Sequence, residues 1–115
     1  MEYLTAAVGE YLPGQLLAVA DGVLAPIAAA LNSTPPYLCL SHKVTTAEDA
    51  VLPVSRVRKD AIYETALAAA AASAAVGGKL QVAAGGLLAA AGAGSFEIVS
   101  LDGKAAGDVV RGRFV

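Results

Sequence analysis

Short apolar or alternating runs separated by glycine-containing turns are the feature that most constrains how this chain can fold. Four turn sites, at residues 21–22, 85–86, 102–103 and 107, lie between such runs. Punctuation at these intervals is typical of an all-β domain. It predicts a small barrel or sandwich of roughly seven to nine short antiparallel strands, with at most one or two short helical segments.

Two of these turn sites are predicted to close hairpins. Asp21-Gly22 is the strongest signal, because glycine accepts the positive φ of a type I′ turn. Gly85-Gly86 predicts a second hairpin in the same way. The flanking segments echo each other, since Gln15-Leu-Leu-Ala-Val-Ala-Asp-Gly-Val-Leu-Ala-Pro resembles Lys79-Leu-Gln-Val-Ala-Ala-Gly-Gly-Leu-Leu-Ala-Ala. We interpret this echo as reuse of hairpin chemistry rather than as a true repeat.

Further strands are expected in the middle of the chain. Residues 37–44 alternate and place His42 on the same face as Leu38 and Val44, where it is interpreted as a core or edge histidine. Residues 50–57 follow, and Pro53 predicts an edge strand or a bulge, because proline cannot donate to a ladder. Ala-rich residues 68–75 alone prefer helix, and they predict a helical turn or two or a compact loop.

The first twelve residues are expected to stand apart from the rest. They precede the Pro13-Gly14 turn, and we divide the chain into an N-terminal arm, residues 1–12, and a single β-rich domain, residues 13–115. An apolar terminus without a hairpin partner can add a strand to another chain, or dock on its own domain or on a sister subunit. Its apolar residues are the predicted partner contacts: Tyr3, Leu4, Val8, Tyr11 and Leu12.

Charge and composition argue against several kinds of partner. Eight basic residues against ten acidic ones are scattered without interleaved aromatics, so no nucleic acid partner is predicted. The longest uncharged run, residues 22–42, is broken by prolines, and no membrane helix is predicted. The Met-Glu-Tyr-Leu start has no basic region, so no signal peptide is expected.

No constellation of residues predicts catalysis, a cofactor or a metal. His42 and Cys39 are the only histidine and cysteine, and they lie on opposite faces of the expected strand. Glu48-Asp49 and the Asp60/Glu64 pair are interpreted as solvated carboxylates rather than an acid/base pair. The glycine-rich stretches fit neither a P-loop nor a dinucleotide fingerprint. We therefore expect no enzyme, and we predict that His42 and Cys39 bind no metal.

The order of motifs from about Gly9 to the C-terminus resembles the head decoration proteins of tailed phages and prophages. The resemblance is carried by Gly9-Glu-Tyr-Leu-Pro-Gly-Gln-Leu-Leu, Leu52-Pro-Val-Ser-Arg-Val-Arg-Lys, Val76-Gly-Gly-Lys-Leu-Gln-Val and a tail that begins Phe96-Glu-Ile-Val-Ser-Leu-Asp-Gly-Lys. It implies a β-rich, non-enzymatic structural protein that binds and stabilises the outer capsid surface. The implied partner is the major capsid protein, and the implied location is the virion.

Self-association is also expected. Alanine occurs 27 times, and a thin alanine core buries little area per residue, so a homo-oligomer is predicted. The preference for a trimer comes from the resemblance alone.

A different function stays open. A β-barrel carrier that bears biotin or lipoate needs an acceptor lysine near a turn, and Lys79 and Lys104 lie near glycine turns. A generic protein-interaction module and a small enzyme or ligand-binding barrel are the remaining alternatives.

Overall fold

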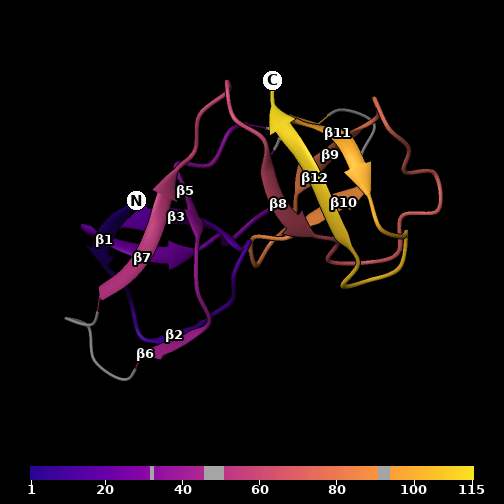
Figure 1. The fold of residues 1–115 in the computed structure, drawn as a ribbon. Helices are drawn as coiled ribbons and strands as arrows, with labels where there is room; N and C mark the ends of the chain where they lie inside the picture. Colours follow the sequence, from indigo (N-terminus) through magenta and orange to yellow (C-terminus); the bar gives the residue numbers. More distant parts are fainter. Residues whose placement is uncertain (32, 46–50, 91–93) are drawn as a thin grey trace.

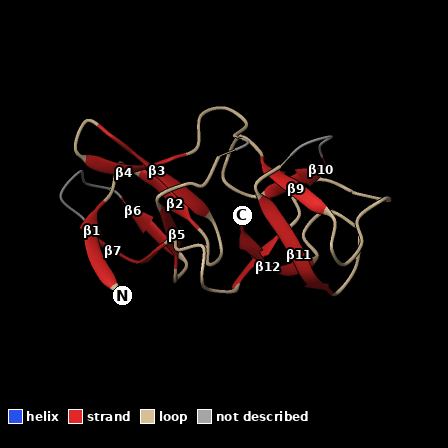
Figure 2. Ribbon diagram, turned by 90° about the horizontal axis from the view of Figure 1, so that it is seen from above, coloured by secondary structure: helices blue, strands red, loops and turns tan. Residues whose placement is uncertain are grey.

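The computed structural model describes residues 1–31, 33–45, 51–90 and 94–115 as an all-β protein. Twelve strands and no helix occur in these ranges (Figures 1 and 2). The strands are β1 (Glu2–Thr5), β2 (Gly9–Tyr11), β3 (Leu16–Ala20), β4 (Val23–Pro26), β5 (Tyr37–Cys39), β6 (Lys43–Thr45), β7 (Val51–Arg56), β8 (Tyr63–Ala66), β9 (Lys79–Val82), β10 (Leu88–Ala90), β11 (Phe96–Leu101) and β12 (Val109–Phe114). No helix in the described part of the chain is long and apolar enough to span a membrane.

The strands form two units that lie side by side along a molecule of 40 × 26 × 21 Å (Figure 1). The first unit is the sheet β1-β7-β5-β3-β4 together with a two-stranded ribbon, β2-β6. The second unit is the sheet β8-β12-β11-β9-β10. If the five sheet strands of each unit are counted along the chain, both sheets have the order first, fifth, fourth, second, third. The two units therefore share one topology.

Each sheet curls until its two edge strands meet. In the first unit Ala6 forms a parallel bridge with Leu24, and in the second unit Leu67 forms a parallel bridge with Leu88. The residue after each bridge repeats the same hydrogen bond: the Ala7 amide donates to the Leu24 carbonyl at 2.8 Å, and the Ala68 amide donates to the Leu88 carbonyl at 2.7 Å. Each unit is thus a small, partly closed barrel, and a single point of contact closes it.

The strand registers identify equivalent residues in the two units. Leu17 lies opposite Tyr37 in the first sheet, and Leu80 lies opposite Phe96 in the second. When residues are counted outward along the strands from these pairs, the pairings of the two units stay in the same register. The two bridges that close the barrels also fall at equivalent positions. The echo in the sequence is therefore part of a structural repeat, and interpreting it only as reused hairpin chemistry was wrong.

The two hairpins differ by one residue at the turn. Asp21 and Gly22 have φ angles of 52° and 81°, so the type I′ turn predicted for them is confirmed. The second turn has three residues, 84–86, since the Ala83 amide donates to the Leu87 carbonyl. Because of this extra residue, the sequence echo matches Leu80 with Leu16, whereas the structure matches it with Leu17.

The interiors of the two barrels are built from equivalent positions filled with different side chains. In each unit, the closing bridge and the central strands contribute apolar residues to the interior. These residues form one buried cluster in each unit. The matched pairs are Ala6 and Leu67, Leu17 and Leu80, Leu24 and Leu88, Tyr37 and Phe96, Cys39 and Ile98, and Leu52 and Val110. Tyr11 of the ribbon fills the first barrel, where Ala6 and Cys39 are small, whereas the second cluster includes the small loop residues Ala71 and Ala74.

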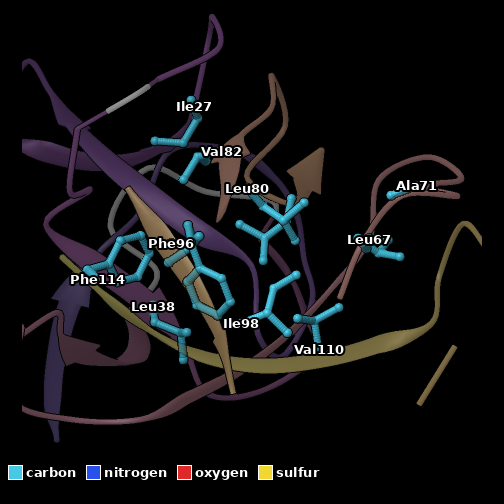
Figure 3. Packing of buried hydrophobic residues seen from close by; sticks show 13 residues of the cluster. Ile27, Leu38, Leu67, Ala71, Leu80, Val82, Phe96, Ile98, Val110 and Phe114 are labelled. Atoms are coloured by element: carbon cyan, nitrogen blue, oxygen red, sulfur yellow. The ribbon is translucent and has the colours of Figure 1, made fainter. Parts of the chain in front are cut away.

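The units are joined by apolar side chains on the outside of the first barrel. Leu16, Ile27 and Leu38 point away from the first interior and belong to the core cluster of the second unit. Figure 3 shows Ile27 beside Val82, and Leu38 near the rings of Phe96 and Phe114. The first unit thus covers one end of the second barrel.

Two expectations about local structure need correction. Residues 37–44 are not one strand, because β5 ends at Cys39 and β6, which starts at Lys43, belongs to the ribbon. The structure has more strands than the seven to nine expected, because the N-terminal residues and the ribbon add to the count. Residues 68–75, for which the sequence predicts a helical turn or two or a compact loop, form a loop.

Pro53 lies inside a sheet rather than at an edge. It belongs to β7, which pairs with β1 on one side and β5 on the other. On the β5 side the Leu40 amide donates to the Pro53 carbonyl at 3.0 Å. Since β5 ends at Cys39, the missing N–H of the proline lies beyond the regular β5 ladder, and the position tolerates it.

The predicted N-terminal arm is part of the first unit. Residues 2–5 form β1 and pair with residues 51–54 of β7, and residues 9–11 form one strand of the ribbon. Of the open alternatives for the arm, the structure has it docked on its own chain. The two repeated units, rather than a boundary after residue 12, organise the molecule.

Candidate contact surfaces

The five predicted contact residues fall into three environments. Tyr3, Val8 and Leu12 are exposed, with 62%, 59% and 44% of their surface accessible. Leu4 is half-buried against the core of the first unit. Tyr11 is fully buried, and its hydroxyl donates to the Ala7 carbonyl at 2.8 Å. Tyr11 therefore supports the fold and cannot contact a partner.

Tyr3 and Leu4 lie beside an open gap between the two edge strands of the first barrel. The strands β1 and β4 meet at the Ala6–Leu24 bridge and leave a hollow of about 340 Å³. Its walls are mostly apolar, and they consist of Tyr3, Leu4, Thr5, Val19, Gly22, Val23, Leu24 and Tyr37. This hollow, which we call the β1–β4 gap, combines an exposed aromatic ring with the edges of two strands.

A second exposed surface lies on the ribbon. Glu10 of β2 is in register with Val44 of β6, and both side chains are exposed. The His42 Nε2 atom lies 3.0 Å from a carboxylate oxygen of Glu10. An ion pair with both partners more than half exposed contributes little to stability. This ribbon face offers Leu12 and Val44 as apolar contacts around a polar centre.

The residues considered for chemistry lie in different environments. Cys39 is buried in the first core, where burial raises the pKa of its thiol, and its Sγ lies 3.0 Å from the Ser41 carbonyl. His42 is exposed on the ribbon rather than in the core. Among the described residues, no group of three or more His, Cys, Asp and Glu side chains is placed to hold a metal ion. Glu48 and Asp49 lie outside the described residues.

The lysines considered for a carrier function lie in different settings. Lys79 begins β9, and Lys104 lies in the loop between β11 and β12, where its ammonium group is 3.4 Å from the Ala72 carbonyl. The outer face of β12 carries charged pairs instead of an apolar surface. Arg111 contacts Glu64 at 2.9 Å and Asp102 at 3.1 Å. Opposite charges are matched there, as expected for a solvated face.

A hollow of about 500 Å³ lies between the two units. Leu38 and Cys39 line it from the first unit, and Ile62 and Thr65 line it from the second. The Thr65 hydroxyl is engaged, because it donates to the Gly14 carbonyl at 2.6 Å. The hollow is thus a seam between the barrels, with its buried hydroxyl already satisfied.

Sequence reasoning missed Val19, Val23 and Val44 as surface residues. Val19 and Val23 belong to runs that are apolar throughout, so their pattern does not separate an outward side from an inward one. Val44 was assigned to a longer strand, which hid its place on the ribbon. The sequence echo does not reveal the exposure of Val19, because it aligns Val19 with Ala83, one residue away from its structural counterpart Val82.

No family model, no curated protein sequence and no solved structure matches this chain. The surfaces described above and the resemblance of the sequence motifs are therefore the grounds for a functional proposal.

Proposed function

We propose that this protein is a non-enzymatic structural protein that binds the outer surface of a phage capsid and stabilises the assembled shell. The observation that carries the proposal is the exposure of three apolar side chains in the N-terminal segment. Tyr3, Val8 and Leu12 present an aromatic ring and two aliphatic side chains to solvent within twelve residues. Where exposed apolar groups form a contiguous patch, they mark a protein-binding surface. The resemblance of the motifs supports a capsid as the partner.

Repetition supplies affinity in such a role. A homo-oligomer that engages several symmetric capsid sites gains avidity even when each contact is weak. A protein that binds the assembled shell and not its dissociated subunits also stabilises the shell by mass action. We propose the trimer as the first oligomer to test, by light scattering of the free protein and of the capsid-bound protein released from particles.

The test is co-sedimentation of the purified protein with matching expanded capsids. Deleting residues 1–12 is unsuitable, because it removes β1 from the first sheet and Tyr11 from the core. The informative variant is the double substitution Tyr3→Ser and Val8→Ser, which changes only exposed side chains. The matched control is Val76→Ser, since Val76 is 67% exposed but belongs to the second unit.

The expected result is saturable binding of the wild-type protein and of the Val76→Ser control. The double variant should bind at least about tenfold more weakly, which corresponds to the loss of about 1.4 kcal/mol of contact energy. Wild-type protein that stays in the supernatant with matching capsids excludes the capsid function. Equal binding by the double variant excludes the N-terminal segment as the contact surface.

A further inference from the structure

In the second barrel, a segment of the first unit fills the gap between the edge strands β8 and β10. This segment, residues 14–16, leaves the Pro13-Gly14 turn and lies between β8 and the β9–β10 turn. The Leu16 amide donates to the Gly86 carbonyl at 2.8 Å, and the Gln15 side-chain amide donates to the Gly85 carbonyl at 2.9 Å. On the other side the Thr65 hydroxyl donates to the Gly14 carbonyl at 2.6 Å. The gap of the second barrel is therefore occupied by backbone from outside that barrel.

A second segment covers the same end of the second barrel. Leu31 forms an antiparallel bridge with Val82, with hydrogen bonds of 2.8 and 3.1 Å in the two directions. Val82 is fully buried as a result, whereas its counterpart Val19 is 52% exposed. In the first sheet, the position equivalent to this bridge is on β3 at Val19. The neighbouring strand β5 begins at Tyr37, opposite Leu17, so it does not reach Val19.

The surroundings of the two equivalent turn glycines, Gly86 and Gly22, also differ between the units. A Cβ atom added to Gly86 would lie 2.1 Å from the Leu16 carbonyl oxygen, because the inserted segment presses against the turn. A Cβ atom added to the equivalent Gly22 would have no neighbour within 4 Å. The gap of the first barrel thus has walls at equivalent positions, and none of residues 1–31, 33–45, 51–90 and 94–115 is inserted into it.

We propose that the β1–β4 gap binds an uncharged segment of another protein chain that leads from a turn into a strand, seated as residues 14–16 are seated in the second unit. The Gly22 carbonyl corresponds to the Gly86 carbonyl and would accept the backbone N–H of the segment. Leu4 stands where the second unit has Thr65, so the wall is more apolar here and favours an aliphatic side chain. The occupant is therefore a segment that follows a turn and has an aliphatic residue directed towards Val19 and Tyr37.

An uncharged segment is favoured because the charges of Arg56 and Glu2, beside the gap-lining Tyr37 and Tyr3, are already paired with each other. Arg56 is 3.4 Å from Glu2 and lies over the ring of Tyr37. A charged residue in the gap would compete with this arrangement and lose hydration against apolar walls. The identity of the partner as a capsid protein rests on the proposed function, but the binding of an uncharged segment can be tested without capsids.

The test is an NMR titration of the isotope-labelled full chain with a peptide of the sequence Leu-Pro-Gly-Gln-Leu-Leu, which is residues 12–17 of this protein. The control peptide carries Asp in place of the first Leu after Gln. We expect saturable shifts of the amides of Val19, Gly22, Val23 and Tyr37 with the first peptide. The control peptide should bind at least tenfold more weakly.

Two variants make the result specific. Val19→Asp should weaken peptide binding at least tenfold, whereas Val76→Asp should leave it unchanged, and both substitutions affect exposed valines. No saturable shift up to millimolar peptide overturns the proposal. Shifts centred on Gly86 and Val82 also overturn it, because the peptide would then be displacing residues 14–16. Concentration-dependent shifts without peptide would assign the gap to a second copy of this chain and overturn the assignment to another protein.

The peptide and capsid experiments fail independently. Peptide shifts without capsid binding keep the gap as a binding site and remove the capsid as its partner. Capsid binding that is unaffected by Val19→Asp, together with no peptide shifts, keeps the proposed function and removes the gap from it.

Discussion

Three equivalent positions hold an ionic cluster in the first barrel and an aromatic cluster in the second. In the first unit they are Glu2, Arg56 and Tyr37: the Arg56 guanidinium lies 5.2 Å above the Tyr37 ring, donates to its hydroxyl at 2.9 Å and pairs with Glu2. In the second unit they are Tyr63, Phe114 and Phe96. The rings of Phe96 and Phe114 meet edge to face at 5.2 Å, and Tyr63 lies 6.3 Å from Phe114.

Whether another segment covers the end of the barrel explains this difference. Phe96 and Phe114 are buried because Leu16 and Leu38 of the first unit pack against them. The corresponding end of the first barrel is open, and an arginine whose side chain is 64% exposed can stay hydrated there. One backbone topology thus supports an ionic or an aromatic cluster at the same place, and solvent access determines which one is stable.

The largest predicted effect comes from truncating the aromatic cluster of the covered barrel. Phe96→Ala should lower the free energy of unfolding by about 3–5 kcal/mol, because it leaves a cavity beneath the junction. The equivalent Tyr37→Ala should cost at least about 1 kcal/mol less, since only the first substitution removes a packed pair of aromatic rings. Urea denaturation followed by circular dichroism measures both.

Phe96→Leu keeps this comparison measurable if Phe96→Ala does not fold. It retains most of the buried volume and should cost less than about 1.5 kcal/mol. Equal losses for Phe96→Ala and Tyr37→Ala would contradict the view that the junction buries one barrel more deeply than the other.

The next prediction compares the two turn glycines. Gly22 and Gly86 both have positive φ angles, 81° and 95°, so alanine at either position is strained by about 1–2 kcal/mol. Only Gly86→Ala also forces a Cβ atom against the Leu16 carbonyl, and it should cost about 1–3 kcal/mol more than Gly22→Ala. Thermal denaturation of the two variants gives the difference. A difference near zero would mean that residues 14–16 do not press on the turn in solution.

Local turn chemistry made much of the fold predictable from the sequence. Asp21 and Gly22 adopt the positive φ angles that their residue types favour, so the hairpin and the all-β class followed from short-range signals. The repeat was harder to detect, because equivalent positions hold pairs as unlike as Arg56 and Phe114. What both units conserve is the position of buried side chains along a shared topology, and this emerges only when the strand order is known.

The candidate contact surface was less predictable, because it depends on which strands meet. Apolar residues of the N-terminal segment look alike in the sequence, yet Tyr11 turns into the core while Tyr3 stays exposed. Pro53 looked like an edge marker, but its tolerance inside a sheet depends on where β5 ends. Such outcomes are set by long-range register, which single-residue preferences do not encode.

Tyr11, which plugs the first barrel, gives that unit a sensitivity to high pH. Burial, and then the nearby Cys39, raise the pKa of Tyr11, so the folded state disfavours its ionised form. The stabilisation is complete below the ordinary tyrosine pKa of about 10 and is lost as the pH rises through the folded value. Tyr11→Phe should lose about 0.5–1.5 kcal/mol at neutral pH, because it removes the hydrogen bond to Ala7.

Above pH 10 the stability of the Tyr11→Phe variant should fall less steeply than that of the wild type. Chemical denaturation at a series of pH values measures this slope. Tyr63→Phe is the control in the second unit, since the Tyr63 hydroxyl is exposed and bonds to the backbone of Arg56 and Arg58. A steeper alkaline loss in Tyr11→Phe than in the wild type would be incompatible with a buried neutral phenol in the first barrel.

The smallest predicted effect concerns the ionic cluster at the open end. Glu2→Gln should change the free energy of unfolding by less than about 1 kcal/mol, because Glu2 and Arg56 are partly exposed and their charges are screened by water. The effect should shrink further in 1 M salt, where the screening length falls to about 3 Å. Glu97→Gln, which removes the exposed pair with Arg113 in the second unit, is the matched control, and it should show a similarly small, salt-sensitive change. A loss of more than about 2 kcal/mol that persists in high salt would place Glu2 in a desolvated environment. The end of the first barrel would then be covered in solution, as the end of the second barrel is, and the contrast between the two units would disappear.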